Sequence, residues 1–139
     1  MKQDYKLGMS YLKQAADQPA TRKLGNFDIP NVGKAEAEHS LGLAYHNGIY
    51  VEKDIQKAVE WYEKGAEHGC PNSSNNLGVM FLHAEGVPQD IARAETLFLT
   101  AYKLGDLNAM GNLVNLYLAW NKYDKALLWH ERALEKNCL

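Results

Sequence analysis

Apolar residues along most of the chain recur at the spacing of one face of an α-helix, and this pattern itself repeats. Ala58, Trp61, Tyr62 and Gly65 stand at positions i, i+3, i+4 and i+7, which share one helix face. The pattern returns 36 residues later, again after a further 32, and once before the first copy: Ala94-Leu97-Phe98-Ala101, Ala126-Trp129-His130-Ala133 and Gly8-Tyr11-Leu12-Ala15. A period of this length predicts an array of helical repeats.

A second helical pattern precedes each of the last three copies. It begins with a Leu-Gly or Leu-Val pair and reaches an aromatic residue four positions after the leucine. Its copies, each 36 residues after the last, are Leu41-Gly42 with Tyr45, Leu77-Gly78 with Phe81, and Leu113-Val114 with Tyr117. Each repeat therefore holds a first helix, A, and a second helix, B.

We predict seven helices in this order: residues 3–17, 34–47, 54–68, 72–84, 90–104, 107–120 and 123–136. The predicted fold class is all-α, a right-handed α-solenoid of helix-turn-helix repeats (an α/α superhelix). Gly42 and Gly78 are poor helix formers in the middle of A helices. Their presence predicts a close approach to the next helix.

Residues that begin and end helices agree with this reading. Asp4, Asp54 and Asp90 each precede a B pattern and can accept hydrogen bonds from the first free N–H groups of a helix. Gly69 and Gly105 follow B patterns, where a left-handed residue is favoured. Between the first two B helices, residues 18–34 are rich in Pro, Gly and Asn. We predict a loop there, inserted as a connector.

The repeated residues resemble the Sel-1-like repeat, a relative of the tetratricopeptide repeat. The resemblance rests on Leu-Gly-x-x-Tyr, Gly-x-x-Val, Asp and Ala-x-x-Trp-Tyr-x-x-x-Ala, as they stand between residues 41 and 66. It implies one domain over residues 1–139: a half repeat with helix B only (1–17), the connector (18–34), repeats 35–70 and 71–106, and a degenerate, tetratricopeptide-like repeat (107–139). Each of the first two repeats keeps one glycine of the family's Gly-x-Gly turn, Gly48 and Gly86, with Tyr50 and Ala84 at the other position.

A narrower resemblance concerns the third repeat. Gly111-Asn112-Leu113-Val114 with Tyr117, together with the long connector, is similar to the megalin-binding adaptor protein, a cytosolic protein built of these repeats. This similarity implies an endocytic receptor tail as the partner.

Composition excludes several classes of function. The net charge is −2 and no basic stripe occurs, so we expect no nucleic-acid partner. The longest apolar run, residues 79–82, is too short for membrane insertion. The first residues lack an apolar signal segment, so we expect a cytoplasmic protein. Cys70 and Cys138 fall at equivalent points of two repeats, roughly 20 Å apart when stacked. We expect two free thiols, which fits a reducing compartment.

No residue pattern supports catalysis, a metal or a cofactor, and we predict that the chain is not an enzyme. Ser10 and Lys13 match the Ser-x-x-Lys of serine β-lactamases, which leaves a β-lactamase-like hydrolase as a remote alternative. The five histidines are dispersed. His130 replaces Tyr62 and Phe98 and is expected to be a half-buried packing residue. Every acidic residue is expected on a helix face or at a cap.

The remaining candidate site is a surface, because A helices line the concave side of such solenoids. Polar residues recur there at the repeat period, beside apolar ones. The predicted partner-binding residues are His39, Ser40, Leu43, His46, Asn75, Asn76, Val79, Leu82, Asn112 and Asn115. Asn side chains both donate and accept hydrogen bonds, which suits the backbone of an extended peptide. The competing interpretation is that they are solvated or pack between repeats.

We therefore predict a non-catalytic module, an adaptor or scaffold, that binds a protein or peptide on the concave face of its repeats. The alternative is a structural stacking segment of a longer solenoid, without a ligand of its own. Exposed apolar ends at Met9, Leu12 and Leu128 would favour that alternative. The expected assembly is a monomer or a weak end-to-end dimer.

Overall fold

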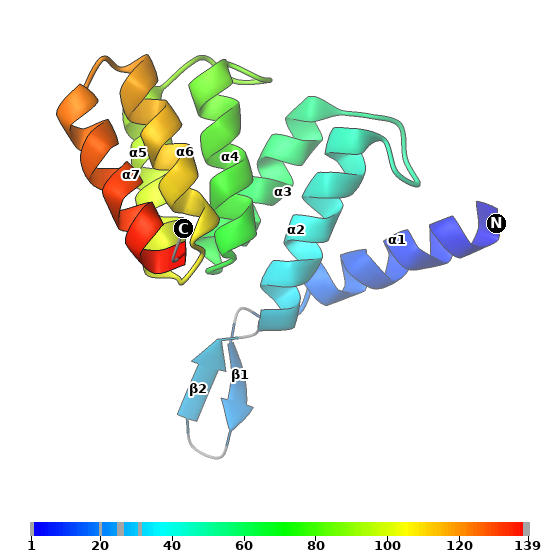
Figure 1. The fold of residues 1–139 in the computed structure, drawn as a ribbon. Coiled ribbons are helices and arrows are strands. Elements are labelled where there is room, and N and C mark those ends of the chain that lie inside the picture. Colours follow the sequence, from blue (N-terminus) through cyan, green and yellow to red (C-terminus); the bar gives the residue numbers. More distant parts are fainter. Residues whose placement is uncertain (1, 20, 25–26, 31, 138–139) are drawn as a thin grey trace. The chain divides into compact units, whose positions relative to one another are not determined.

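The computed structural model describes residues 2–19, 21–24, 27–30 and 32–137, which form seven helices and two strands (Figure 1). In chain order they are α1 (Lys2–Ala16), β1 (Thr21–Leu24), β2 (Phe27–Pro30), α2 (Val32–Asn47), α3 (Ile55–Glu67), α4 (Pro71–His83), α5 (Ile91–Lys103), α6 (Asn108–Ala119) and α7 (Tyr123–Asn137). Each predicted helix is present, with both ends within two residues of the predicted positions. The prediction of an all-α fold of helix-turn-helix repeats is confirmed.

The connector differs from the predicted loop. Strands β1 and β2 pair antiparallel, with Thr21 opposite Pro30 and Leu24 opposite Phe27. The sequence between them is Gly25-Asn26, and Gly and Asn are the residue types that two-residue hairpin connections favour. Those same residues also signal an irregular loop, so composition alone did not distinguish the two.

The helices fall into two compact units, Met1–Ser73 and Ser74–Leu139. In the first unit, α1 packs against α2 and α2 packs against α3. In the second, α5 packs against α6 and α6 against α7. Met9 on α1, whose exposure would favour the alternative of a stacking segment, is only 5% exposed. Leu12 is half-buried and Leu128 is exposed.

Helices α2–α3, α4–α5 and α6–α7 are the A and B helices of three helical hairpins. In each of the first two helical hairpins, an aromatic ring fits against a glycine. A Cβ atom added at Gly42 would lie 2.4 Å from Cδ1 of Tyr62, and one added at Gly78 would lie 2.6 Å from Cε1 of Phe98. Both rings are completely buried. The absence of a side chain on the A helix therefore lets the ring of the B helix approach the backbone, as the sequence predicts.

The turn between helices A and B uses two residues with left-handed backbone. In the first turn Gly48 and Tyr50 have φ of 68° and 70°, and in the second Ala84 and Gly86 have φ of 54° and 73°. Residues with a Cβ are disfavoured at such angles. Each turn therefore has one relaxed position, occupied by glycine, and one strained position.

Two of the three predicted N-caps are present. The backbone N–H of Lys57 donates to Oδ1 of Asp54 at 3.1 Å, and that of Arg93 donates to Oδ1 of Asp90 at 3.0 Å. Asp4 is not a cap, because α1 already begins at Lys2. The glycines predicted to end helices, Gly69 and Gly105, have φ of 86° and 98°.

A part-buried hydrogen bond joins α6 to α5. The hydroxyl of Tyr117, a residue only 3% exposed, donates to Oε2 of Glu95 at 2.5 Å. Burial, together with the hydrogen bond and negative charge of Glu95, raises the pKa of Tyr117 above its ordinary value of 10.0. The neutral phenol is thus the form that the fold stabilises.

The first prediction concerns the glycine contact. Gly78→Ala should lower the free energy of unfolding by about 1–2 kcal/mol, because the added methyl group overlaps the ring of Phe98. Gly111→Ala on α6 is the matched control, since nothing lies within 4 Å of its added Cβ. It should raise the free energy of unfolding by up to about 1 kcal/mol through helix propensity alone. Urea unfolding measures both, and equal effects of the two substitutions would refute the contact.

The second prediction concerns the strained turn. Ala84→Gly should stabilise the protein by about 0.5–1 kcal/mol, because glycine adopts positive φ without a steric cost. Gly86→Ala in the same turn should destabilise it by a similar amount. Thermal unfolding compares the two, and a lower melting temperature for Ala84→Gly would contradict the assigned strain.

The third prediction is a pH dependence. Because the pKa of Tyr117 is higher in the folded than in the unfolded state, its contribution to stability is fully present below about pH 10. That contribution is lost as the pH rises through the folded pKa. Tyr117→Phe should be less stable than the wild type by about 1–2 kcal/mol at neutral pH, and the difference should shrink above about pH 10. Urea unfolding across this range tests it, and a constant difference would be the contrary result.

Candidate protein-binding surface

A polar network in the second unit ties α6 to α4. The side-chain amide of Asn75, only 7% exposed, donates to Oδ2 of Asp106 at 2.5 Å. Its carbonyl oxygen accepts a hydrogen bond from Nδ2 of Asn112 at 3.3 Å. Asp106 also accepts from the backbone N–H of Asn108, at the start of α6. Both ends of the Asn75 amide are therefore used within the protein, where they hold two A helices in register.

The other predicted residues of this unit differ in exposure. Asn76 and Val79 on α4 are half-buried, as is Asn112 on α6, while Asn115 is exposed. Leu82 is 4% exposed and belongs to the core. Asn76, Val79 and Asn115 thus retain surface that a ligand can reach, and the network of Asn75 supports the helices that carry them.

The four predicted residues of the first unit lie on α2. His39 and His46 pack around Tyr62, with ring centroids 5.7 and 5.9 Å from its ring. Nδ1 of His39 is 3.2 Å from Oγ of Ser73, and Nδ1 of His46 is 3.2 Å from the hydroxyl of Tyr62. Burial lowers the pKa of His39. Ser40 and Leu43 are half-buried.

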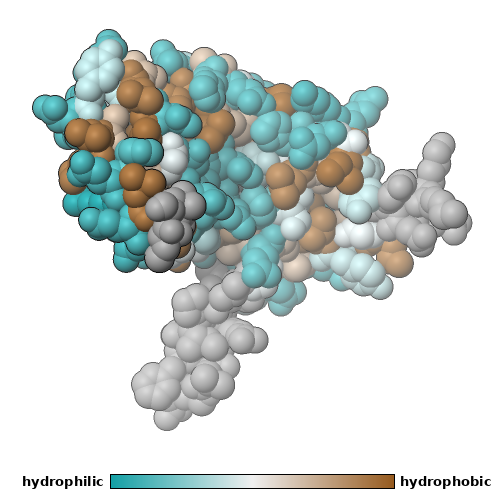
Figure 2. All heavy atoms as spheres, in the orientation of Figure 1, coloured by the Kyte–Doolittle hydropathy of each residue, from teal (hydrophilic) through white to brown (hydrophobic). Residues whose placement is uncertain are grey.

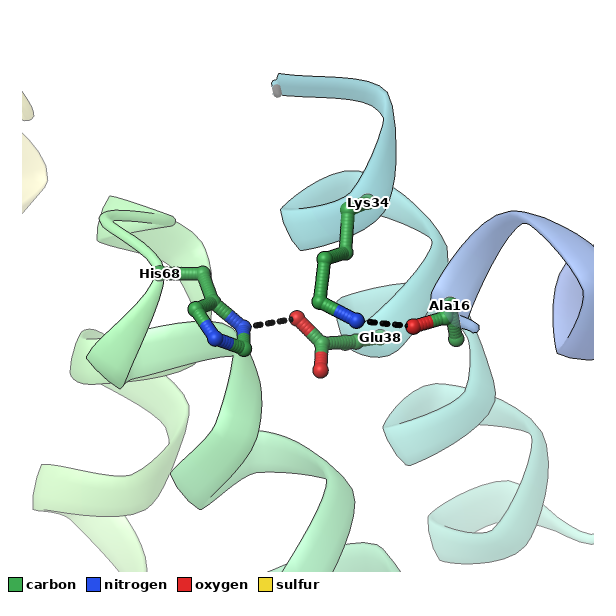
Figure 3. A network of polar contacts seen from close by, with 4 residues as sticks. All are labelled: Ala16, Lys34, Glu38 and His68. Atoms are coloured by element: carbon green, nitrogen blue, oxygen red, sulfur yellow. Dashed lines mark hydrogen bonds and ion pairs between the residues drawn. The ribbon is translucent and has the colours of Figure 1, made fainter. Parts of the chain in front are cut away.

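The sequence reading missed a buried carboxylate. Glu38 on α2 is only 1% exposed, whereas every acidic residue was expected on a helix face or at a cap. Nδ1 of His68 lies 2.6 Å from Oε1 of Glu38, and Nζ of Lys34 donates to the backbone oxygen of Ala16 (Figure 3). The contacts link α2 to the residue that follows α3 and to the end of α1.

The signal that could have found this residue is the repeat itself. Glu38 stands 36 residues before Ser74 and 72 before Met110, and both of these are completely buried. The position is therefore a core position in every repeat. A carboxylate there needs a partner, since an unpaired buried charge is costly.

His130 is also placed differently from the expectation. It is exposed rather than half-buried. Its counterparts Tyr62 and Phe98 fit against Gly42 and Gly78, but the equivalent residue of α6 is Val114. In the third helical hairpin, Val114 therefore has a side chain at the position where glycine leaves room for a ring in the other two.

The motif residues Ser10 and Lys13 lie on exposed parts of α1. With Met9 and Tyr50 they line an open hollow of about 520 Å³. Within the described residues, no group of three His, Cys, Asp or Glu side chains is placed to hold a metal ion. Cys70 is buried with a free thiol, and Cys138 lies outside the described residues. No described helix is both long and apolar enough to cross a membrane.

Known structures show the same fold. The chain resembles c5321, a protective antigen of uropathogenic Escherichia coli strains that displays an SLR fold, with a TM-score of 0.74, 28% identity, and coverage of 97% of this chain and 29% of that one. It also resembles a Sel1 repeat protein from Oxalobacter formigenes, with a TM-score of 0.67, 26% identity, and coverage of 73% and 44%.

A curated relative matches part of the sequence. The chitin synthase regulator SKT5 of Malassezia restricta is 32% identical over 68 residues, which are 47% of this chain and 5% of the relative. The chain thus spans less than half the length of each of these proteins. None of these matches supports the similarity to the megalin-binding adaptor protein, nor the receptor tail that it implied.

The model of the Sel1 repeat family matches residues 1–19, 35–70, 71–106 and 116–138. These segments cover most of the chain and include the repeated Leu-Gly and Ala-Trp-Tyr positions. The chain therefore belongs to the Sel1 repeat family.

Proposed function

We propose that the chain is a non-catalytic protein-interaction module, an adaptor whose ligand is an extended peptide segment held on the α4–α6 face of the second unit. One observation carries this proposal. The reachable amides of Asn76 and Asn115 lie on the two helices that the Asn75–Asp106–Asn112 network joins. The amides are therefore presented by a fixed framework.

The chemistry of this face suits a peptide backbone. A side-chain amide offers donors and an acceptor, so it can pair with both the N–H and the C=O of an extended segment. Val79, three residues after Asn76 on α4, is half-buried and offers an apolar contact for a ligand side chain. Because the helices are already ordered, binding costs little conformational entropy in the module.

The comparisons support a role through contact with other proteins. One relative is by its name a regulator of an enzyme, chitin synthase. Helical repeat proteins in general expose extended surfaces rather than deep pockets.

The fourth prediction tests this face. Peptides enriched from a random display library by the wild-type chain should bind the double variant Asn76→Ala/Asn115→Ala about tenfold more weakly, since two hydrogen bonds are lost. Fluorescence anisotropy with labelled peptides gives the affinities. Circular dichroism should show unchanged helicity, because neither residue is part of the Asn75 network.

Thr96→Ala is the matched control. Thr96 is exposed on α5, and its hydroxyl bonds only to the backbone oxygen of Ala92 in its own helix among the contacts described. It should leave peptide affinity unchanged. If the library yields no binders, or if the double variant binds them as tightly as the wild type, the proposed face is wrong.

A further inference from the structure

Tyr50, in the turn between α2 and α3, combines a strained backbone with an exposed side chain. Its φ is 70°, in the left-handed region that residues with a Cβ disfavour, and the residue is 48% exposed. The equivalent residue of the next turn is Gly86, with φ of 73°, so the turn itself requires no side chain at this position. Strain that the turn does not require directs attention to what the tyrosine side chain does.

Tyr50 lines an open hollow of about 520 Å³ between α1 and the α2–α3 turn. The apolar residues of the hollow are Met9 of α1, which is buried, and Val51 of the turn, which is half-buried. Its polar residues are exposed and share one face of α1 and its last turn: Ser10, Lys13, Gln14 and Asp17. Figure 2 shows a similar mixture of hydrophobic and hydrophilic residues over the visible face of α2 and α3.

The face of α1 that lines the hollow is also open in the interior B helices. Helices α3 and α5 each have an A helix before and after them in the chain. The counterparts of Ser10 and Gln14 are nevertheless exposed in both, as Glu60 and Lys64 of α3 and as Thr96 and Thr100 of α5. Neighbouring A helices therefore leave this face in solvent. A further repeat before α1 would leave the hollow open for the same reason.

The groups around the hollow suit a neutral sugar. The face of a tyrosine ring is an apolar surface on which the C–H groups of a pyranose ring can pack. Hydroxyl, amide, ammonium and carboxylate groups together offer donors and acceptors, which match sugar hydroxyl groups that do both. The charges of Lys13 and Asp17 cancel, so the lining does not select an ionic ligand. The helix rises about 10 Å from Ser10 to Asp17, which is close to the length of a disaccharide.

We propose that this hollow binds a neutral disaccharide unit of a glycan, with one pyranose ring packed on Tyr50 and its hydroxyl groups hydrogen-bonded by the polar side chains of α1. The site belongs to the first unit and does not rest on the function proposed for the α4–α6 face of the second. A peptide suits the hollow less well, because peptide side chains need apolar pockets and the exposed lining on α1 is polar.

The fifth prediction separates binding from stability at Tyr50. Tyr50→Gly should raise the melting temperature, because glycine adopts positive φ without a steric cost. The same change should weaken sugar binding about tenfold, because the ring is lost. Maltose and cellobiose are the probes, titrated into the full chain and followed by NMR chemical shifts, and at least one should bind with a Kd of about 1 mM. Weaker binding by a more stable variant cannot result from unfolding.

Three further variants locate the ligand. Tyr50→Phe keeps both the ring and the strain, and should retain affinity within about threefold of the wild type. Gln14→Ala should weaken binding about fivefold, because hydrogen bonds to the sugar are lost. Thr100→Ala is the control, since Thr100 is the exposed counterpart of Gln14 in α5 and its hydroxyl donates to the backbone oxygen of Thr96 in its own helix. It should leave affinity unchanged.

Any of four results would overturn the proposal. The first is that neither sugar shifts a resonance at about 10 mM, and the second is that Tyr50→Gly binds the sugar as tightly as the wild type. The third is a lower melting temperature for Tyr50→Gly, which would remove the strain from the argument. The fourth is that peptides captured from the display library lose affinity on Tyr50→Gly, which would make the hollow a peptide site.

Discussion

The close fit of a B-helix ring against a glycine of the A helix is the contact on which the first two hairpins depend. Tyr62 against Gly42, and Phe98 against Gly78, each leave no room for a methyl group on the facing helix. This approach buries the rings of Tyr62 and Phe98 completely. Once the two helices lie this close, their remaining faces are directed away from each other. Those faces must then be covered by the next helix or remain at the surface.

The third hairpin lacks this fit. Val114 stands in place of the glycine, and His130 in place of the ring is exposed. Surface that is core elsewhere becomes an open apolar hollow between α6 and α7. A degenerate repeat is therefore more than a weakened copy of its neighbours. Its departures from the pattern leave apolar side chains of α6 and α7 at the surface.

Polar residues serve two separate purposes in this molecule. Asn75, Glu95 and Glu38 are directed between helices, where hydrogen bonds or ion pairs satisfy them. Such paired groups favour one helix arrangement over others, because any shift would leave them unpaired. Asn76 on α4 is half-buried and Asn115 on α6 is exposed, so both retain reachable surface. The first group holds the framework, and the second is available for recognition.

The sequence by itself determined the helices, their order, the caps at Asp54 and Asp90, and the glycine contacts, because these depend on spacing along the chain and on local backbone geometry. Only the tertiary structure decided that Asn75 is used internally, that Glu38 is buried beside His68, that His130 is exposed, and that the connector contains a β-hairpin. Periodicity identifies which residues share a helix face. It does not reveal which neighbour covers that face, since this depends on side chains from residues far away in the chain.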